Sequence, residues 1–240
     1  MRKIAFILLF ALAGLARAQQ ATVPATARIH VCADESTGEI SPYIYGQFIE
    51  YMGRCIDGGI YDPASPCWRH ALATAWFLNA IIRQANIVKM ANWAQMVNIL
   101  APIRTSDDAS VCQTVFYPLR EYRKRALGEA LVTQVQADRL PGENVDVLNC
   151  VATLDRSRRT LTLCVVNVSP ESVKADIRIT SWQQVHQNDA TILTATGLDA
   201  QNTLTDPGRN VVRMRKVPIR KSADDFTFPA ESIVFLTYRF

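Results

Sequence analysis

The sequence has little net charge and few residues of the kinds that hold metals. It contains 26 basic and 22 acidic residues among 240, and three of the basic ones lie in a leading segment that we expect to be removed. The remaining 23 basic residues nearly balance the acidic ones, so the chain gives no electrostatic reason to expect a nucleic-acid partner. The three histidines are far apart and no Cys-x-x-Cys occurs, so no zinc site is expected.

Long apolar runs are also missing, since none after the leading segment approaches the 18 residues typical of a membrane-spanning helix. Residues 4–15 are apolar, follow a short basic start, and precede small residues at Ala16 and Ala18. This pattern is typical of a secretory signal peptide, and the run is too short for a bilayer core of about 30 Å. We expect export to the periplasm or the extracellular space, with cleavage near Ala18 and no membrane association afterwards.

Six cysteines remain after the leading segment, and their spacing forms no compact disulfide framework. Export would permit disulfides, but Cys150 and Cys164 lie in strand-like runs, where cysteine is usually a small buried hydrophobe. We therefore favour buried free thiols over disulfides for Cys32, Cys55, Cys67, Cys112, Cys150 and Cys164.

The pattern of apolar residues changes along the chain from strands to helix and back to strands. Residues 27–33 alternate as in a strand, residues 43–49 resemble a buried strand, and residues 70–84 predict a helix that is apolar on most sides. Short predicted strands separated by polar turns follow at 112–117, 131–137, 145–154, 160–168, 173–180, 190–195, 211–216 and 232–239. The predicted fold class is mainly β, with a C-terminal jelly-roll-like β-sandwich.

Two stretches resemble the α-L-arabinofuranosidases of glycoside hydrolase family 51. Residues 40–54, ISPYIYGQFIEYMGR, with GGIYD at 58–62, are similar to the opening of the catalytic domain. ALATAWFLN at 71–79 and VKMANWAQMVNILAPI at 88–103 are similar to the end of that domain. The resemblance continues into the family's C-terminal β-sandwich at 151–155, 161–167 and 198–207. It implies a (β/α)8 barrel beside a sandwich, with an N-terminal strand that joins the sandwich.

The middle of the barrel has no counterpart in this sequence. A complete barrel needs roughly 200–250 residues, whereas only residues 41–103 are barrel-like. We therefore expect a signal peptide at 1–18, an N-terminal strand region at 19–40, an incomplete remnant of a (β/α)8 barrel at 41–103, and the sandwich at 104–240. We also expect the helix at 70–84 to expose apolar surface, because the barrel strands that it would cover are missing.

The resemblance implies a retaining glycosidase, which needs one carboxyl as acid/base and another as nucleophile, about 5–5.5 Å apart. The family's acid/base glutamate follows an asparagine, but no Asn-Glu dipeptide occurs here, and no catalytic residue is assigned. Two substrate contacts are implied instead: Glu50 matches a glutamate that binds arabinose hydroxyls, and Gln95 matches a glutamine at the sugar site. The alternative interpretation of Glu50 is a solvent-exposed charge at the end of a strand, without a role in sugar binding. No cofactor is implied.

Other motifs are interpreted as structural. The run Arg120–Arg125 is interpreted as a solvated loop, with polyanion binding as the less favoured alternative. Residues 213–216 alternate along a predicted strand and are interpreted as its solvent-exposed face. Trp68, Trp76 and Trp93 are expected in the core rather than stacked on sugars.

The sequence thus predicts an internally shortened arabinofuranosidase without hydrolytic activity, whose partner would be an arabinose-containing polysaccharide. Three alternatives stay open: a secreted non-catalytic protein that binds carbohydrate or a partner, an enzyme with a rebuilt site beside Glu50, and an error that joined two ends of an intact gene. A homo-oligomer is compatible with each.

Overall fold

The structure, a computed structural model, describes residues 25–48, 67–94, 96–98, 101–180, 186–219 and 225–239. The expected signal peptide lies outside the described residues. Neither α-helix within the described ranges is long and apolar enough to cross a membrane.

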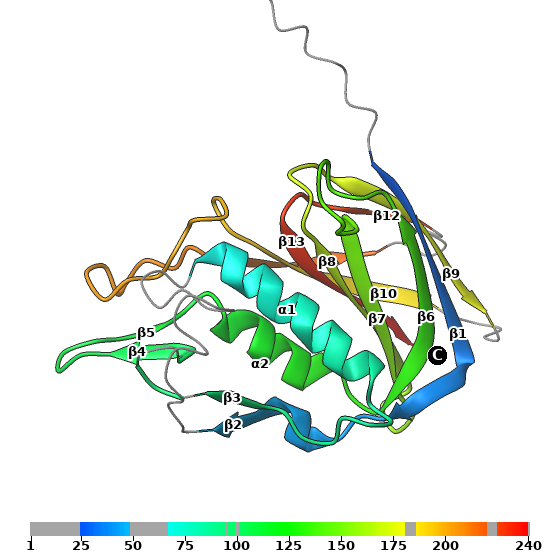
Figure 1. The fold of residues 1–240 in the computed structure, drawn as a ribbon, viewed down its shortest axis with the longest axis horizontal. Coiled ribbons are helices and arrows are strands. Elements are labelled where there is room, and N and C mark those ends of the chain that lie inside the picture. The colour runs from blue at the N-terminus through cyan, green and yellow to red at the C-terminus, as the bar shows by residue number, and fades with distance from the viewer. Residues whose placement is uncertain are drawn as a thin grey trace, which may run out of the picture.

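A nine-stranded sheet dominates the described part of the chain (Figure 1). Its strands lie in the order β11-β10-β13-β8-β7-β6-β1-β9-β12, which confirms the mainly β fold class. Their bounds are β1 (Thr26–Glu39), β6 (Glu129–Ala137), β7 (Leu148–Asp155), β8 (Thr160–Asn167), β9 (Val173–Thr180), β10 (His186–Thr194), β11 (Arg213–Pro218), β12 (Asp225–Phe228) and β13 (Ser232–Arg239).

The sheet curls into a half-barrel, so its two halves face each other across a shared core (Figure 1). Only three residue pairs, at Glu129–Leu131 of β6, connect the halves through β7. Alternating residues from both halves fill the space between them, among them Ile29, Leu163, Phe228 and Val234, each fully buried. The predicted sandwich core is therefore enclosed by one continuous sheet.

Strand β1 confirms the predicted role of residues 27–33. It pairs in antiparallel fashion with β6 and in parallel with β9, so it lies inside the sheet rather than at its edge. Ile29, Val31 and Ala33 point into the core between the two halves. The period-two alternation that predicted the strand also determines which of its faces is buried.

Two helices cover the other face of the sheet, α1 (Trp68–Arg83) and α2 (Phe116–Arg125), and they contact each other (Figure 1). A second core lies beneath them, built from Leu72, Leu78 and Ile82 of α1 together with Val166 and Phe235 of the sheet. The prediction of an unpartnered apolar helix is thus wrong for most of its surface. Among the large apolar side chains of α1, Phe77 remains exposed, and Trp76 and Ile81 are half-buried.

The sequence prediction fails at α2. Residues 112–117 were expected to form a strand and Arg120–Arg125 a loop, but Phe116–Arg125 is helical. Val115, Phe116 and Tyr117 favour strands by propensity, and the short strand β5 (Ser110–Cys112) does end just before them. Packing decides the outcome, because Tyr122 is fully buried and meets Phe235 edge to face at 5.1 Å.

The remaining elements are short. They are the 3-10 helix η1 (Pro42–Tyr45) and the strands β2 (Gly46–Phe48), β3 (Asn92–Ala94) and β4 (Ile103–Thr105), of which β4 pairs with β5. The strand predicted at 43–49 corresponds to β2, which begins at Gly46, three residues after the predicted start.

Candidate functional site

The barrel-like residues form a small parallel sheet of their own. β2 and β3 pair in parallel, with Gly46 opposite Asn92 and Phe48 opposite Ala94. These are the segments that resemble the opening and the end of a catalytic barrel, and the first and last strands of a closed barrel are neighbours. Among the described residues, no further strand joins this pair.

The base of this small sheet is fixed to the helices. Ile44 is buried in the core beneath them, and the Tyr45 hydroxyl donates a hydrogen bond to the Ala126 carbonyl at 2.8 Å. Burial raises the pKa of Tyr45 well above its ordinary value, which leaves it a neutral hydrogen-bond donor. The Ala91 amide also donates to the Tyr43 carbonyl at 3.2 Å.

Both predicted substrate contacts lie outside the described residues. Glu50 follows β2 by two residues and Gln95 follows β3 directly. Asp57 and Asp62, the other carboxylates of the barrel-like part, also fall outside the described ranges.

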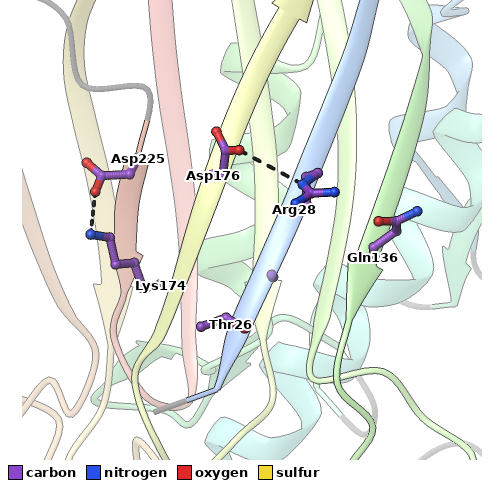
Figure 2. A pocket seen from close by; sticks show the side chains of 7 residues that line it. Thr26, Arg28, Gln136, Lys174, Asp176 and Asp225 are labelled. Atoms are coloured by element: carbon purple, nitrogen blue, oxygen red, sulfur yellow. Dashed lines mark ion pairs between the residues drawn. The ribbon is translucent and has the colours of Figure 1, made fainter.

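A hollow of about 710 Å³ lies on the outer face of the sheet, over β12, β9, β1 and β6 (Figure 2). Sequence reasoning did not find it, although charged residues alternate along residues 174–178. Figure 2 shows polar side chains from all four strands projecting from the sheet there. Its lining residues are Thr26, Ala27, Arg28, Gln136, Lys174, Asp176 and Asp225.

Ion pairs neutralise both carboxylates of the hollow. Asp176 lies 3.9 Å from Arg28 and 3.2 Å from Arg178, and Asp225 lies 2.6 Å from Lys174. The two aspartates are directly opposite each other across β9 and β12. The hollow therefore offers paired charges and hydrogen-bonding groups to a polar ligand.

The buried carboxylate on α2 is structural as well. Glu121 is only 2% exposed and receives hydrogen bonds from Arg120 at 2.8 Å and Arg125 at 3.0 Å. Burial by itself would raise the pKa of Glu121, but the two guanidinium groups outweigh it and the pKa is lowered. A glycosidase acid needs the opposite shift.

A buried polar network joins α1 to the sheet. The Asn79 amide donates to the Asn149 side-chain oxygen at 2.8 Å, and its own oxygen accepts a hydrogen bond from the Tyr122 hydroxyl at 2.7 Å. Arg83 donates to the Cys150 carbonyl at 2.9 Å. Since these groups bind one another, the network holds elements together rather than forming an open site.

Trp68 confirms its predicted place in the core. It is 1% exposed, and its indole N–H donates to the Glu231 carbonyl at 2.7 Å. Trp76 and Trp93 are half-buried. In the part of the chain that the structure describes, no cluster of three metal-binding side chains occurs.

Comparisons with known proteins agree with this architecture. The model of the α-L-arabinofuranosidase C-terminal domain family matches residues 59–232. An intracellular exo-α-(1→5)-L-arabinofuranosidase of Streptomyces lividans is 31% identical over 139 residues, which cover 56% of this chain and 21% of that protein. A probable α-L-arabinofuranosidase C of Aspergillus clavatus is 27% identical over 177 residues, 70% of this chain and 34% of the relative.

Solved structures show the same fold. A GH51 arabinofuranosidase from Xanthomonas axonopodis pv. citri has a TM-score of 0.63 at 22% identity, over 72% of this chain and 36% of that one. The GH51 enzyme of Thermotoga petrophila has the same TM-score and identity, over 71% and 38%. The chain spans only about a fifth to a third of the length of the two sequence relatives above.

Proposed function

The chain belongs to the α-L-arabinofuranosidase family through its C-terminal domain, and from that premise we propose that it is a non-hydrolytic member of the family. In this proposal the protein is exported, cleaved near Ala18, and binds arabinose-containing glycans without cutting them. The ancestral reaction would be removal of terminal α-L-arabinofuranosyl groups with retention of configuration.

The direct pairing of β2 with β3 carries the proposal. The 19 residues from 49 to 67 are all that separate β2 from α1, whereas a single βαβ unit takes about 30. The strands that resemble the two ends of a barrel therefore meet without room for the strands between them. Active sites of such barrels are assembled from loops after many strands, so most of the catalytic face is missing.

The residues that remain can bind sugar but do not suffice for hydrolysis. β2 and β3 end at the paired residues Phe48 and Ala94, which shortly precede Glu50 and Gln95. A carboxylate and an amide can both bind sugar hydroxyls. Retention requires a second carboxyl about 5–5.5 Å from the first, held protonated beside an ionised partner.

Turnover of an aryl α-L-arabinofuranoside by the mature chain tests this proposal. We expect the wild type to release aryl alcohol at the rate seen without protein, and the Glu50→Gln and Asp57→Asn variants to behave identically. Enzymes lower such barriers by roughly 8–23 kcal/mol, so real catalysis would be obvious. Sustained turnover that either substitution abolishes would instead establish a rebuilt active site.

The hollow on the outer face is the best-supported place for glycan binding without hydrolysis. Its arginine, aspartates and glutamine present donors and acceptors that match sugar hydroxyls. Its volume lies within the range of about 300–1,000 Å³ typical of small-ligand sites.

A matched pair of substitutions on β6 tests this site. Gln136 lines the hollow, whereas Gln134, two residues away on the same strand, does not, and both are exposed. In a titration with an arabino-oligosaccharide followed by NMR, Gln136→Ala should weaken binding about 3- to 10-fold, the loss of one hydrogen bond. Gln134→Ala should leave it unchanged. Equal effects of the two substitutions would exclude the hollow.

A further inference from the structure

We propose that α2 and the edge strand β11 together form a surface that binds an acidic polysaccharide, one whose sugars carry carboxylates. We call this surface the basic band. It is separate from the hollow and goes beyond the proposed function. Its cations are Arg120, Arg123, Lys124, Arg213, Arg215 and Lys216.

Positive charge is concentrated in these two elements. The 16 residues of α2 and β11 hold seven of the chain's 26 basic residues and one of its 22 acidic residues. That acidic residue, Glu121, is buried and already paired with arginines. All other residues together carry a net charge of −2, so the surface is locally cationic on a nearly balanced molecule.

A contact between α2 and β11 joins the helix to one face of the edge strand. The Arg120 guanidinium donates to the Met214 sulfur at 3.7 Å, which places the helix alongside the edge strand. Arg120 also lies over the rings of Phe116 and Tyr117, at 5.7 and 5.4 Å from their centroids. Met214 is 48% exposed and adds an apolar surface on which a sugar ring could pack.

Most cations of the band have no internal counter-charge. Arg213, Arg215 and Lys216 are exposed and pair with no carboxylate among the described residues. Arg123 likewise has no acidic partner there and lies 6.0 Å from the centroid of the Tyr45 ring. Basic residues on an edge strand also discourage sheet-to-sheet aggregation, but that role explains only β11 and not the helix beside it.

The layout of the cations favours a linear polyanion. Met214 and Lys216 share the face of β11 that meets α2, whereas Arg213 and Arg215 project from the other face, about 6.6 Å apart. Because β11 is the edge of the sheet, the band continues around this edge from the helix to Arg213 and Arg215. A chain with a carboxylate on each repeating unit can engage successive cations of this kind, and arginine binds carboxylates through two parallel hydrogen bonds. A polysaccharide fits the chain's membership of a glycoside hydrolase family. Nucleic acid is the alternative that the experiment must exclude.

The test is binding of the full chain to polygalacturonate, neutral arabinan and single-stranded DNA. The double variant Arg215→Gln/Lys216→Gln removes two exposed cations of the band. The control Arg156→Gln/Arg158→Gln removes two exposed arginines near the β7–β8 turn. We expect the band variant to weaken polygalacturonate binding about 5- to 20-fold, because each exposed charge pair that is lost contributes up to about 1 kcal/mol to binding. The control variant should weaken binding less than about twofold.

Raising NaCl to about 0.5 M should abolish binding to polygalacturonate, because exposed charges are screened at that ionic strength. Arabinan should be unaffected by the band variant. Equal losses in the two double variants, salt-independent binding, or tighter binding to DNA than to polygalacturonate would each overturn the proposal. None of these measurements depends on hydrolysis, so the outcome is separable from the proposed function.

Discussion

Asn79 connects three parts of the fold through one buried amide. It is fully buried on α1 and makes hydrogen bonds with Tyr122 of α2 and with Asn149 and the Cys164 carbonyl of the sheet. An asparagine within the apolar helix pattern gave no sign of this role, because its partners lie up to 85 residues away. Buried polar partners of this kind follow from tertiary packing and not from local sequence.

Replacing Asn79 by alanine should therefore be costly. The substitution removes the amide and leaves the Tyr122 hydroxyl with one partner fewer, for a predicted loss of about 2–3 kcal/mol in the free energy of unfolding. Asn86→Ala, at an exposed position just beyond α1, should change it by less than about 0.5 kcal/mol. Urea denaturation measures both, and similar effects of the two substitutions would disprove the structural role of the network.

Glu121 makes stability depend on pH. Its pKa is lowered in the folded chain, so its ion pairs stabilise the fold above the pKa of an unfolded glutamate, about 4.3. That contribution is lost as the pH falls through the lower folded pKa. Glu121→Gln should cost about 1–3 kcal/mol at pH 7, and its stability should converge on that of the wild type in acid. A gap that stays constant from neutral to acid pH would show that the carboxylate charge is irrelevant.

Two cysteines illustrate how strand alternation constrains chemistry. Cys150 and Cys164 lie on the adjacent strands β7 and β8, but Cys150 faces the core between the two halves of the sheet and Cys164 faces the helices. Side chains on opposite faces of a sheet do not meet, so these two cannot form a disulfide with each other. Burial raises the pKa of both thiols.

Among the elements, the strands were the most predictable and α2 the least. Most of the strands β6 to β13 were found from alternation and turn residues, because each half of the sheet has one face on the shared core. β12 was missed because four residues at a sheet edge give too short a pattern. At α2 the local preference of Val115–Tyr117 for strand was overridden by burial of Tyr122.

Helix α1 offers a direct comparison of its two faces. Leu78 is 4% exposed against the sheet, whereas its neighbour Phe77 is 58% exposed. Leu78→Ala should lower the free energy of unfolding by about 2–5 kcal/mol because it leaves a cavity in the core. Phe77→Ala should change it by less than about 0.5 kcal/mol. If Phe77→Ala proved the more damaging, the helix would have to pack through its other face.

Considered as a whole, the molecule keeps the β domain of its family together with a short parallel sheet. The sequence predicts that the middle of the barrel is missing, because segments that resemble its two ends lie within 63 residues. The curl of a single nine-stranded sheet was not evident, since nothing in the strand pattern specifies that β6 and β7 share only three pairs. The hollow was also missed, because it combines residues from both ends of the sequence.

One NMR experiment on an intact arabino-oligosaccharide mixed with the mature chain tests binding and cleavage together. Saturation of protein signals should transfer to the oligosaccharide, and its anomeric proton signals should keep their intensity over a day. Hydrolysis by a retaining enzyme would instead produce the anomeric signals of free arabinose. Transfer without new signals is the result expected of a non-hydrolytic glycan-binding member of the family, and the appearance of free arabinose would contradict it.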